Sequence, residues 1–175
     1  MKTILTTIEM ELAIAGFFGI RQNIIVPNIS WGLLKYECDV LIITKSACGI
    51  EVEIKRSKSD MQADFKKRHK HDDPRIREFY YCFPFDIYES CKDLVPEEAG
   101  ILVVYQSIYH NYAKEEKKPV IRKNWRKLTK EEIYTAARLG SMRIWNLKNT
   151  IINLKKDKKK AKKSIAKNSN QQILI

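Results

Sequence analysis

Cysteine is scarce in this sequence, and its spacing excludes two common uses of the residue. The 175 residues include Cys38, Cys48, Cys82 and Cys91, and no two of these form a C-x-x-C pair. A zinc ribbon needs closely paired cysteines, and a disulfide framework is typical of small secreted domains. Because Cys38, Cys48 and Cys82 lie in apolar, strand-like surroundings, we expect buried free thiols in a reducing compartment.

Long apolar runs are also absent. No stretch reaches the ~18 apolar residues that a membrane-spanning helix needs. The first twenty residues resemble a signal peptide in hydrophobicity, but Glu9 and Glu11 interrupt them and no small-residue cleavage site follows. We therefore expect a cytoplasmic protein with no membrane partner.

Acidic residues are outnumbered by basic ones. The chain has 33 Lys and Arg against 21 Asp and Glu, so its formal net charge is +12. Residues 155–175 hold eight lysines and one aspartate, which leaves +5 for residues 1–154. Such a basic excess favours a polyanionic partner. We predict one folded domain over 1–154 and a lysine-rich, flexible tail over 155–175.

Hydrophobic periodicity predicts an α/β fold with a mixed central sheet flanked by helices, in the order α-β-β-β-α-β-β-α. The lysine-rich residues 113–119 predict a loop, and Thr129 with Glu132 forms a capping-box pattern at the start of the last helix, which we expect to end near Leu154. The other predicted elements are a helix at 6–20, strands at 23–27, 36–44 and 50–56, a capped polar helix at 57–73 and a strand at 78–85. Residues 95–105 predict a short turn or helix start and then a buried strand.

The segment GIEVEIKRSKSD, residues 49–60, contains the most informative pattern. Alternation along a strand places Glu51, Glu53 and Lys55 on one face. Asp39, in the preceding strand, shares its face with apolar residues, where a carboxylate is costly unless it is paired or binds a metal. A hairpin between the two strands would bring Asp39 across from Glu53 and Lys55.

Carboxylates on adjacent strands can share one Mg²⁺ or Mn²⁺ ion, which prefers oxygen ligands. Asp39 and Glu53 are therefore candidate metal ligands, and Lys55 is a candidate catalytic residue that orients water or stabilises charge on a phosphate. The alternative is a salt bridge between Asp39 and Lys55 without a metal, because E-x-K alternation is common on strands.

Other charged residues have weaker patterns. Glu11, on the apolar face of the first helix, is a candidate third metal ligand, whereas Glu9 better suits the helix dipole. Glu51 could support the site or be solvated. His69 and His71 cannot share a helix face, so we interpret both as surface residues.

A cluster of basic residues precedes the last helix. Arg122, Lys123, Arg126 and Lys127 surround Trp125, a mixture typical of surfaces that contact nucleic-acid phosphates. These four residues are candidate DNA contacts.

The chain resembles the MmcB-like family of DNA-repair proteins, within the PD-(D/E)xK nuclease superfamily. Asp39 stands at the position of the strand aspartate of that family, and the resemblance covers residues 8 to 128. The family pattern E-I-K-x-S-x-x-D-x-x-x-D-x-K, with its later Pro and P-E-x-x-G positions, is matched by Glu53, Ile54, Lys55, Ser57, Asp60, Asp64, Lys66, Pro84, Pro96, Glu97 and Gly100. Tyr36, Glu37 and Cys38 depart from it, because the family has basic residues there.

The resemblance implies a restriction-endonuclease-like fold and a Mg²⁺- or Mn²⁺-dependent nuclease that acts on DNA in repair. It places Ser57, Asp60, Asp64 and Lys66 at the edge of the site, where the aspartates would hold Lys55, Lys66 or a second metal, and Lys66 would also contact DNA. Repair proteins are further candidate partners, and a homodimer is left open. A non-catalytic DNA-binding module that recruits repair proteins and a restriction-type endonuclease are the alternatives.

Overall fold

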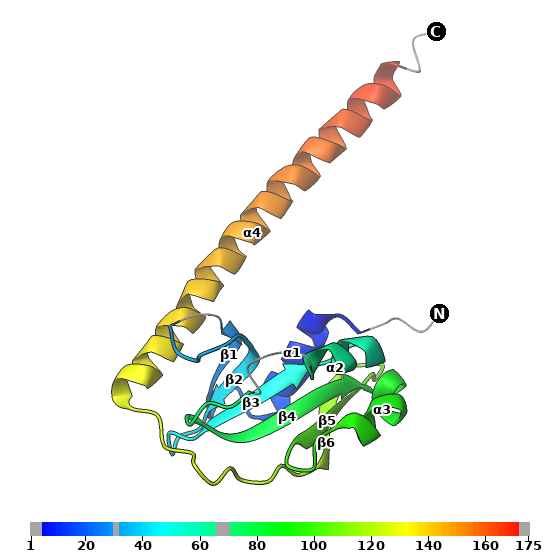
Figure 1. Cartoon of the computed structure of the whole chain (residues 1–175). Coiled ribbons are helices and arrows are strands. Elements are labelled where there is room, and N and C mark those ends of the chain that lie inside the picture. The colour runs from blue at the N-terminus through cyan, green and yellow to red at the C-terminus, as the bar shows by residue number, and fades with distance from the viewer. Residues whose placement is uncertain (1–4, 30–31, 66–70, 172–175) are drawn as a thin grey trace. The chain divides into compact units, whose positions relative to one another are not determined.

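The computed structural model describes residues 5–29, 32–65 and 71–171, with side chains described as far as residue 158 (Figure 1). The chain divides into two compact units, Met1–Ala137 and Arg138–Ile175. The first unit contains a mixed sheet with its helices, and the second consists of the greater part of one long helix.

The first unit has the mixed α/β architecture that the sequence predicts, with three additional elements. The observed elements are α1 (Thr7–Phe17), β1 (Ile24–Ile29), β2 (Cys38–Ile43), β3 (Gly49–Ile54), α2 (Lys58–Asp64), β4 (Ile76–Pro84), α3 (Phe85–Cys91), the 3-10 helix η1 (Lys92–Leu94), β5 (Gly100–Tyr105), β6 (Tyr112–Lys117) and α4 (Lys130–Gln171). The additional elements are α3, η1 and β6.

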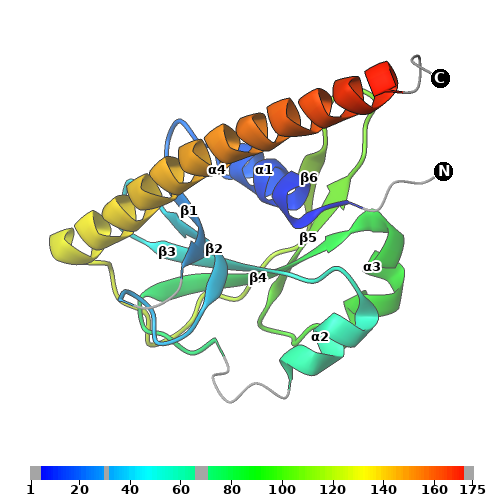
Figure 2. The ribbon, with the colours of Figure 1, turned by 90° about the horizontal axis from the view of Figure 1, so that it is seen from above.

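Six strands form one sheet in chain order, β1-β2-β3-β4-β5-β6 (Figure 2). β1, β2 and β3 are antiparallel neighbours, β3, β4 and β5 are parallel, and β6 is antiparallel to β5. Parallel neighbours need crossover connections, which here contain α2 and α3. Because both crossovers proceed in the same direction along the sheet and crossovers are right-handed, α2 and α3 cover the same face.

The opposite face of the sheet is covered by α1. Met10 and Ile14 of α1 belong to one buried cluster with Val52 of β3 and Leu102 and Val104 of β5, and the helix lies mainly over β5 and β6. A capping box fixes the start of α1: the Thr6 side chain accepts from the Glu9 backbone, and Glu9 accepts from the Thr6 backbone. Glu9 therefore stabilises the helix N-terminus, as its position in the sequence suggested.

The face under α2 and α3 combines aromatic residues with charged ones. Phe79 and Tyr81 of β4 pack with Met61 of α2. Glu51 pairs with Phe79 and Glu53 pairs with Tyr81 in the parallel register, so the alternation of β3 directs both carboxylates to this face. All four cysteines are free and buried, which confirms the expectation of buried free thiols at Cys38, Cys48 and Cys82.

Two element predictions were wrong or incomplete. The predicted loop at 113–119 contains β6, an edge strand whose charged side chains find partners: Glu115 accepts from Tyr80 Oη at 2.7 Å and Glu116 from Tyr105 Oη at 2.9 Å. Charged residues on an edge strand also discourage pairing with other chains. The helix α3 was not predicted, because it has seven residues and begins directly after Pro84 without a side-chain cap.

The last helix begins as predicted and ends later than predicted. Thr129 Oγ1 accepts from the Glu132 backbone at 3.2 Å, and Glu132 accepts from the Thr129 backbone at 2.8 Å, which forms the expected capping box. The predicted end near Leu154 is wrong, since α4 continues to Gln171. None of the helices in the described part of the chain is long and apolar enough to cross a membrane.

Gly49 marks a close backbone approach at the start of β3. A Cβ added there would collide with the backbone carbonyl of Arg75, which cannot move aside as a side-chain end could. We expect Gly49→Ala to lower the free energy of unfolding by about 3 kcal/mol. Gly16→Ala is the matched control, because a Cβ at this exposed position in α1 meets nothing within 4 Å and should stabilise the helix by ~0.5–1 kcal/mol. Equal urea midpoints for the two variants would contradict this expectation.

Candidate functional site

The β2–β3 hairpin brings Asp39 and Glu53 to one face of the sheet. Val40 pairs with Val52 in the antiparallel register, so Asp39 lies opposite Glu53, one position further along. Asp39 Oδ2 accepts a hydrogen bond from the Ile54 backbone N–H at 2.8 Å, which fixes this half-buried carboxylate at the end of β3. The hairpin thus provides the proximity that the sequence pattern required.

Lys55 follows the end of β3 and is held between two carboxylates. Its Nζ donates to Glu53 Oε1 at 2.8 Å and to Asp64 Oδ1 at 2.7 Å. The residue is only 2% exposed. An ammonium group that is removed from water needs such partners, because an unpaired buried charge is strongly unfavourable.

The helix α2 provides Asp60 and Asp64. Ser57 is the N-cap, and its side chain accepts from the Asp60 backbone at 3.1 Å. The two aspartates are one turn apart on one side of the helix. Asp64 is buried and contacts Lys55, as the family resemblance implied, whereas Asp60 is exposed.

A hollow of about 360 Å³ lies at the carboxyl end of β3. It is lined by Thr7, Asp39, Glu53, Ile54, Lys55, Arg56 and Asp60. Three carboxylates, an ammonium group and a guanidinium group therefore face one small volume. Such a set can hold a hard divalent cation on its oxygens and a phosphate on its cations.

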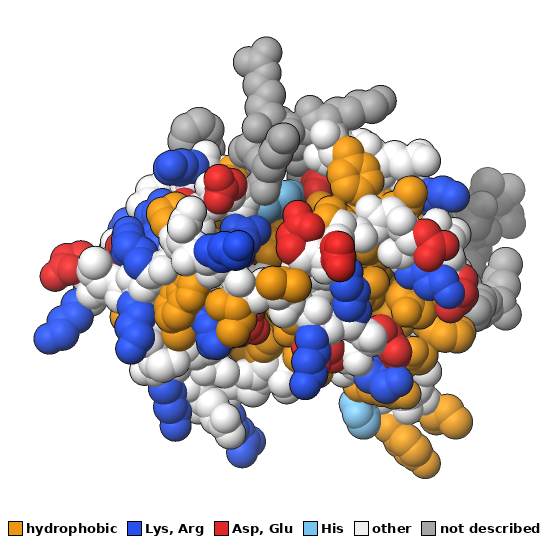
Figure 3. All heavy atoms as spheres, turned by 60° about the horizontal axis from the view of Figure 1, so that its bottom comes forward, with side chains coloured by type: hydrophobic (Ala, Val, Ile, Leu, Met, Phe, Trp, Pro, Cys, Tyr) orange, Lys and Arg blue, Asp and Glu red, His pale blue; other side chains and the backbone are white. Residues whose placement is uncertain are grey.

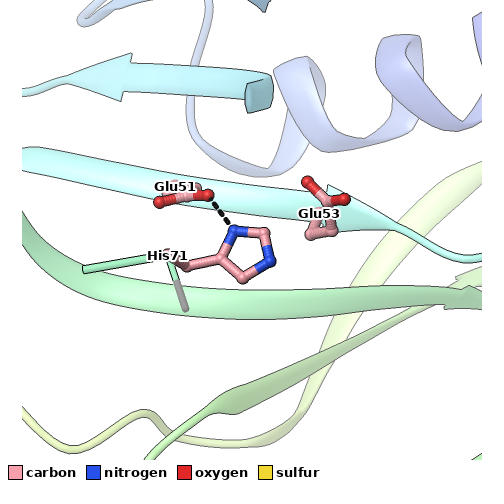
Figure 4. Close-up of side chains that lie close together, drawn as sticks. All are labelled: Glu51, Glu53 and His71. Atoms are coloured by element: carbon pink, nitrogen blue, oxygen red, sulfur yellow. Dashed lines mark hydrogen bonds and ion pairs between the residues drawn. The ribbon is translucent and has the colours of Figure 1, made fainter. Parts of the chain in front are cut away.

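A chain of hydrogen bonds extends from Lys55 under α2 to the middle of β3. Asp64 Oδ2 accepts from Tyr81 Oη at 2.7 Å and lies 3.0 Å from His71 Nε2. His71 Nδ1 lies 2.7 Å from Glu51 Oε1, and Tyr36 Oη donates to Glu51 Oε2 at 2.6 Å. Figure 4 shows the His71 ring beside β3, with its dashed contact to Glu51.

The interpretation of His71 as a surface residue was wrong. That interpretation assumed that the helix after Lys55 continues as far as His71, where i,i+2 histidines would point apart. Instead α2 ends at Asp64, and His71 has a φ of 51° and is buried between Glu51 and Asp64. Glu51, which the sequence left open, is fully buried. His69 lies outside the described residues.

The pKa values in this hydrogen-bonded network depend on burial and on hydrogen bonding together. Burial by itself lowers the pKa of His71, but the hydrogen bonds to Asp64 and Glu51 outweigh it and raise the pKa from 6.5 to about 9. Burial raises the pKa of Glu51, and the bonds from His71 and Tyr36 oppose this change. Near neutral pH, His71 is therefore an imidazolium that donates to both carboxylates.

The raised pKa of His71 predicts a loss of stability at alkaline pH. The folded chain retains a proton that the unfolded chain releases near pH 6.5, so the contribution is complete below pH 6.5 and disappears as the pH passes about 9. The shift corresponds to ~3 kcal/mol. Urea unfolding in chelator across this range should show the decline in the wild type and a flatter profile in His71→Gln. Parallel profiles would contradict the assignment.

Glu11 does not reach the hollow. It lies on α1, which packs against the opposite face of the sheet from Glu53, and its Oε1 accepts from Asn28 Nδ2 at 2.8 Å. The structure therefore does not bring Glu11 to the other predicted ligands, although Thr7 at the start of the same helix does line the hollow. Lys66, the remaining predicted site residue, lies outside the described residues.

The residues of the predicted basic cluster differ in whether their side chains already have partners within the protein. Arg126 forms two bonds to Glu132 at 2.7 and 2.8 Å, and Arg122 donates to the backbone oxygen of His71. Lys123 and Lys127 are exposed. Lys and Arg side chains on the face shown in Figure 3 are interspersed with acidic and hydrophobic ones, so this face is not uniformly basic.

Comparisons with known proteins support the fold and leave the chemistry open. No protein-family model matches the chain, and no curated protein matches it. The structure is similar to the solved structure of a protein of unknown function from Silicibacter pomeroyi. The two share 13% sequence identity with a TM-score of 0.59 over 86% of this chain and 93% of that chain.

Proposed function

We propose that the chain is a metal-dependent DNA nuclease of the PD-(D/E)xK type that acts in DNA repair, related to the MmcB-like family that its sequence resembles. The observation that carries the proposal is the meeting of Asp39, Glu53 and Lys55 in one hollow on one face of the sheet. These residues come from a hairpin and the residue that follows it, which is the pattern D…E-x-K of the sequence.

The donor set suits Mg²⁺ or Mn²⁺. Asp39 and Glu53 would hold the ion, since both offer carboxylate oxygens to the hollow and hard cations prefer oxygen ligands. When bound, such an ion polarises a phosphoryl group and lowers the pKa of a coordinated water.

The residues of the chain would position the substrate. Lys55, fixed by Glu53 and Asp64, presents a positive charge beside the carboxylates, where it would stabilise charge that develops on a phosphate. The exposed Lys123 and Lys127, and the lysines of residues 155–175, would add sequence-independent attraction to the DNA backbone. Repair-protein partners and a homodimer stay predictions.

One observation favours a second function, a DNA-binding module without hydrolysis. Lys55 Nζ already donates to two carboxylates and is almost completely buried, so its role could be structural. A module of this kind would recruit repair proteins to DNA and would need no metal ion.

Metal dependence separates the two functions. Single-stranded, nicked and duplex DNA should be incubated with the full chain in Mg²⁺, in Mn²⁺ and in chelator. A nuclease cleaves at least one form with either metal and none in chelator. Equal DNA retention in metal and chelator, without cleavage of any form, would reject the nuclease and support the binding module. Discrete fragments from plasmid DNA would indicate a restriction-type enzyme.

A further inference from the structure

A second group of potential metal ligands is buried beside β3, next to the hollow. Glu51, Glu53 and His71 each offer one ligand atom, and these atoms lie within 4.8 Å of one another (Figure 4). The exposed fractions are 0% for Glu51, 3% for Glu53 and 5% for His71. Two carboxylates and an imidazole that are shielded from water and converge in this way form a mixed oxygen–nitrogen donor set.

The spacing of His71 and Glu51 is close to that of two ligands on one ion, and Glu53 lies within 4.8 Å of both. Bonds of ~2.1 Å to oxygen and nitrogen place adjacent ligand atoms roughly 3 Å apart. His71 Nδ1 and Glu51 Oε1 are separated by 2.7 Å, so they would need to open only slightly. A divalent cation would replace the proton that these two atoms share.

Each ligand is also supported by a partner on another atom, an arrangement that metal sites use to orient their ligands. His71 Nε2 lies 3.0 Å from Asp64 Oδ2, which leaves Nδ1 toward the cluster. Tyr36 Oη donates to Glu51 Oε2 at 2.6 Å, and Lys55 Nζ donates to Glu53 Oε1 at 2.8 Å. The imidazole thus has a carboxylate partner, and each glutamate has a hydrogen-bond donor. These supporting contacts are a second observation in favour of a metal site, separate from the closeness of the three ligand atoms.

We propose that Glu51, Glu53 and His71 bind a divalent transition-metal ion, such as Mn²⁺, Fe²⁺, Co²⁺ or Zn²⁺, at a site distinct from the Mg²⁺ position between Asp39 and Glu53. The imidazole nitrogen favours these metals, whereas Mg²⁺ prefers oxygen ligands alone. Glu53 belongs to both sites and would bridge them.

An ion can approach this site from two sides. The hollow at the end of β3 includes Glu53, and a separate cavity of about 210 Å³ includes His71 and Asp64. Aromatic residues Phe79 and Tyr81 line that second cavity, so the ion would lie in surroundings of low polarity that strengthen its electrostatic interactions.

The proposal does not require nuclease activity, because binding of the ion can be measured directly. The chelator-treated full chain should be titrated with Co²⁺ in a large excess of Mg²⁺, which occupies the oxygen-only position, while the visible absorption of Co²⁺ is followed. We expect one Co²⁺ per chain in the wild type and also in Asp39→Asn. This second result separates the site from the proposed Mg²⁺ position.

Variants around the site provide the decisive comparison. We expect His71→Gln to weaken Co²⁺ binding by at least ~100-fold, and Tyr36→Phe, which removes only the donor behind Glu51, to weaken it by roughly 10–100-fold. His110→Gln is the matched control, because His110 is exposed and lies in the loop before β6; its affinity should equal that of the wild type. Near-UV circular dichroism in chelator checks that each variant is folded.

Pulsed EPR of bound Mn²⁺ gives a readout that a purely structural role of His71 would not affect. We expect coupling to an imidazole nitrogen in the wild type, and its loss in folded His71→Gln. If His71→Gln does not fold, the Co²⁺ affinity of Tyr36→Phe and the EPR spectrum of the wild type still test the proposal. Absence of Co²⁺ binding in excess Mg²⁺, unchanged affinity in Tyr36→Phe, or a wild-type spectrum without nitrogen coupling would each overturn the proposal.

Discussion

Replacement of Asp64 by alanine is expected to lower the free energy of unfolding by about 3–5 kcal/mol. Asp64 accepts from Lys55 at 2.7 Å and from Tyr81 at 2.7 Å, and it lies 3.0 Å from His71. Without this carboxylate, a buried ammonium and a buried imidazolium each lose an opposite charge. Breaking a buried ion pair from one side is among the most costly single substitutions, because the remaining charge stays out of water.

The matched control for Asp64→Ala is Asp60→Ala. Asp60 lies one turn earlier on the same helix but is exposed, and its side chain accepts only a long bond of 3.4 Å from the Arg56 backbone. We expect a cost of about 0.5 kcal/mol or less for this variant. Chemical unfolding of both variants in chelator at neutral pH measures the difference. Losses of similar size would show that Asp64 does not hold the buried cations.

Replacement of Lys55 by alanine is expected to slow DNA cleavage by roughly 10²–10⁴-fold at saturating Mg²⁺. Among the described residues that line the hollow with Asp39 and Glu53, Lys55 is the one lysine, and its position is fixed by two short hydrogen bonds. Loss of the positive charge should raise the barrier of the chemical step more than it weakens DNA binding, because Lys55 makes a small part of the total basic surface.

Loss of folding must be separated from loss of catalysis in this comparison. Lys55→Arg keeps the positive charge for Glu53 and Asp64 but changes the shape of the cation, so we expect a folded chain with slow cleavage. Lys58→Ala, at the exposed start of α2, should cleave at the wild-type rate. Single-turnover rates measure all three variants, and wild-type cleavage by Lys55→Ala would reject the assigned role of the lysine.

Much of the fold followed from local patterns in the sequence. The alternation in β3, the apolar residues of β2 and the short turn between them predict a hairpin, and the hairpin register then determines that Asp39 lies opposite Glu53. The cap at Thr129 was also readable, and the cap of α2 was narrowed to Ser57 or Ser59, since a capping residue interacts with backbone only three residues away.

The buried position of His71 could not be read from the sequence in this way. Its partners are Glu51, twenty residues earlier, and Asp64, seven residues earlier, so the contacts depend on where α2 ends and how the chain returns to the sheet. A local rule about helix faces failed because the helix was shorter than its polar pattern suggested. No local pattern linked His71 to these two carboxylates.

The predictions for the helix face of Glu11 and for residues 113–119 failed for a similar reason. Spacing placed Glu11 on the apolar face of α1 with Ile8, whereas the helix buries Met10, Ala13 and Ile14 and leaves Ile8 exposed. The charged residues of β6 look like a loop because a sequence shows no partners for them, whereas the sheet provides Tyr80 and Tyr105. In both cases tertiary contacts decided what local pattern could not.

The most direct test of the central claim is a comparison of Mg²⁺-dependent DNA cleavage by the wild type and by Asp39→Asn, on the same set of single-stranded, nicked and duplex substrates. Asparagine keeps the size of the side chain, and its amide oxygen can still accept from the Ile54 backbone, so the hairpin should stay intact. If the carboxylates of β2 and β3 jointly hold the ion, the wild type cleaves with Mg²⁺ and the variant is slower by roughly 10²-fold or more. Equal cleavage by the two proteins, or none by the wild type on any substrate, would contradict the account.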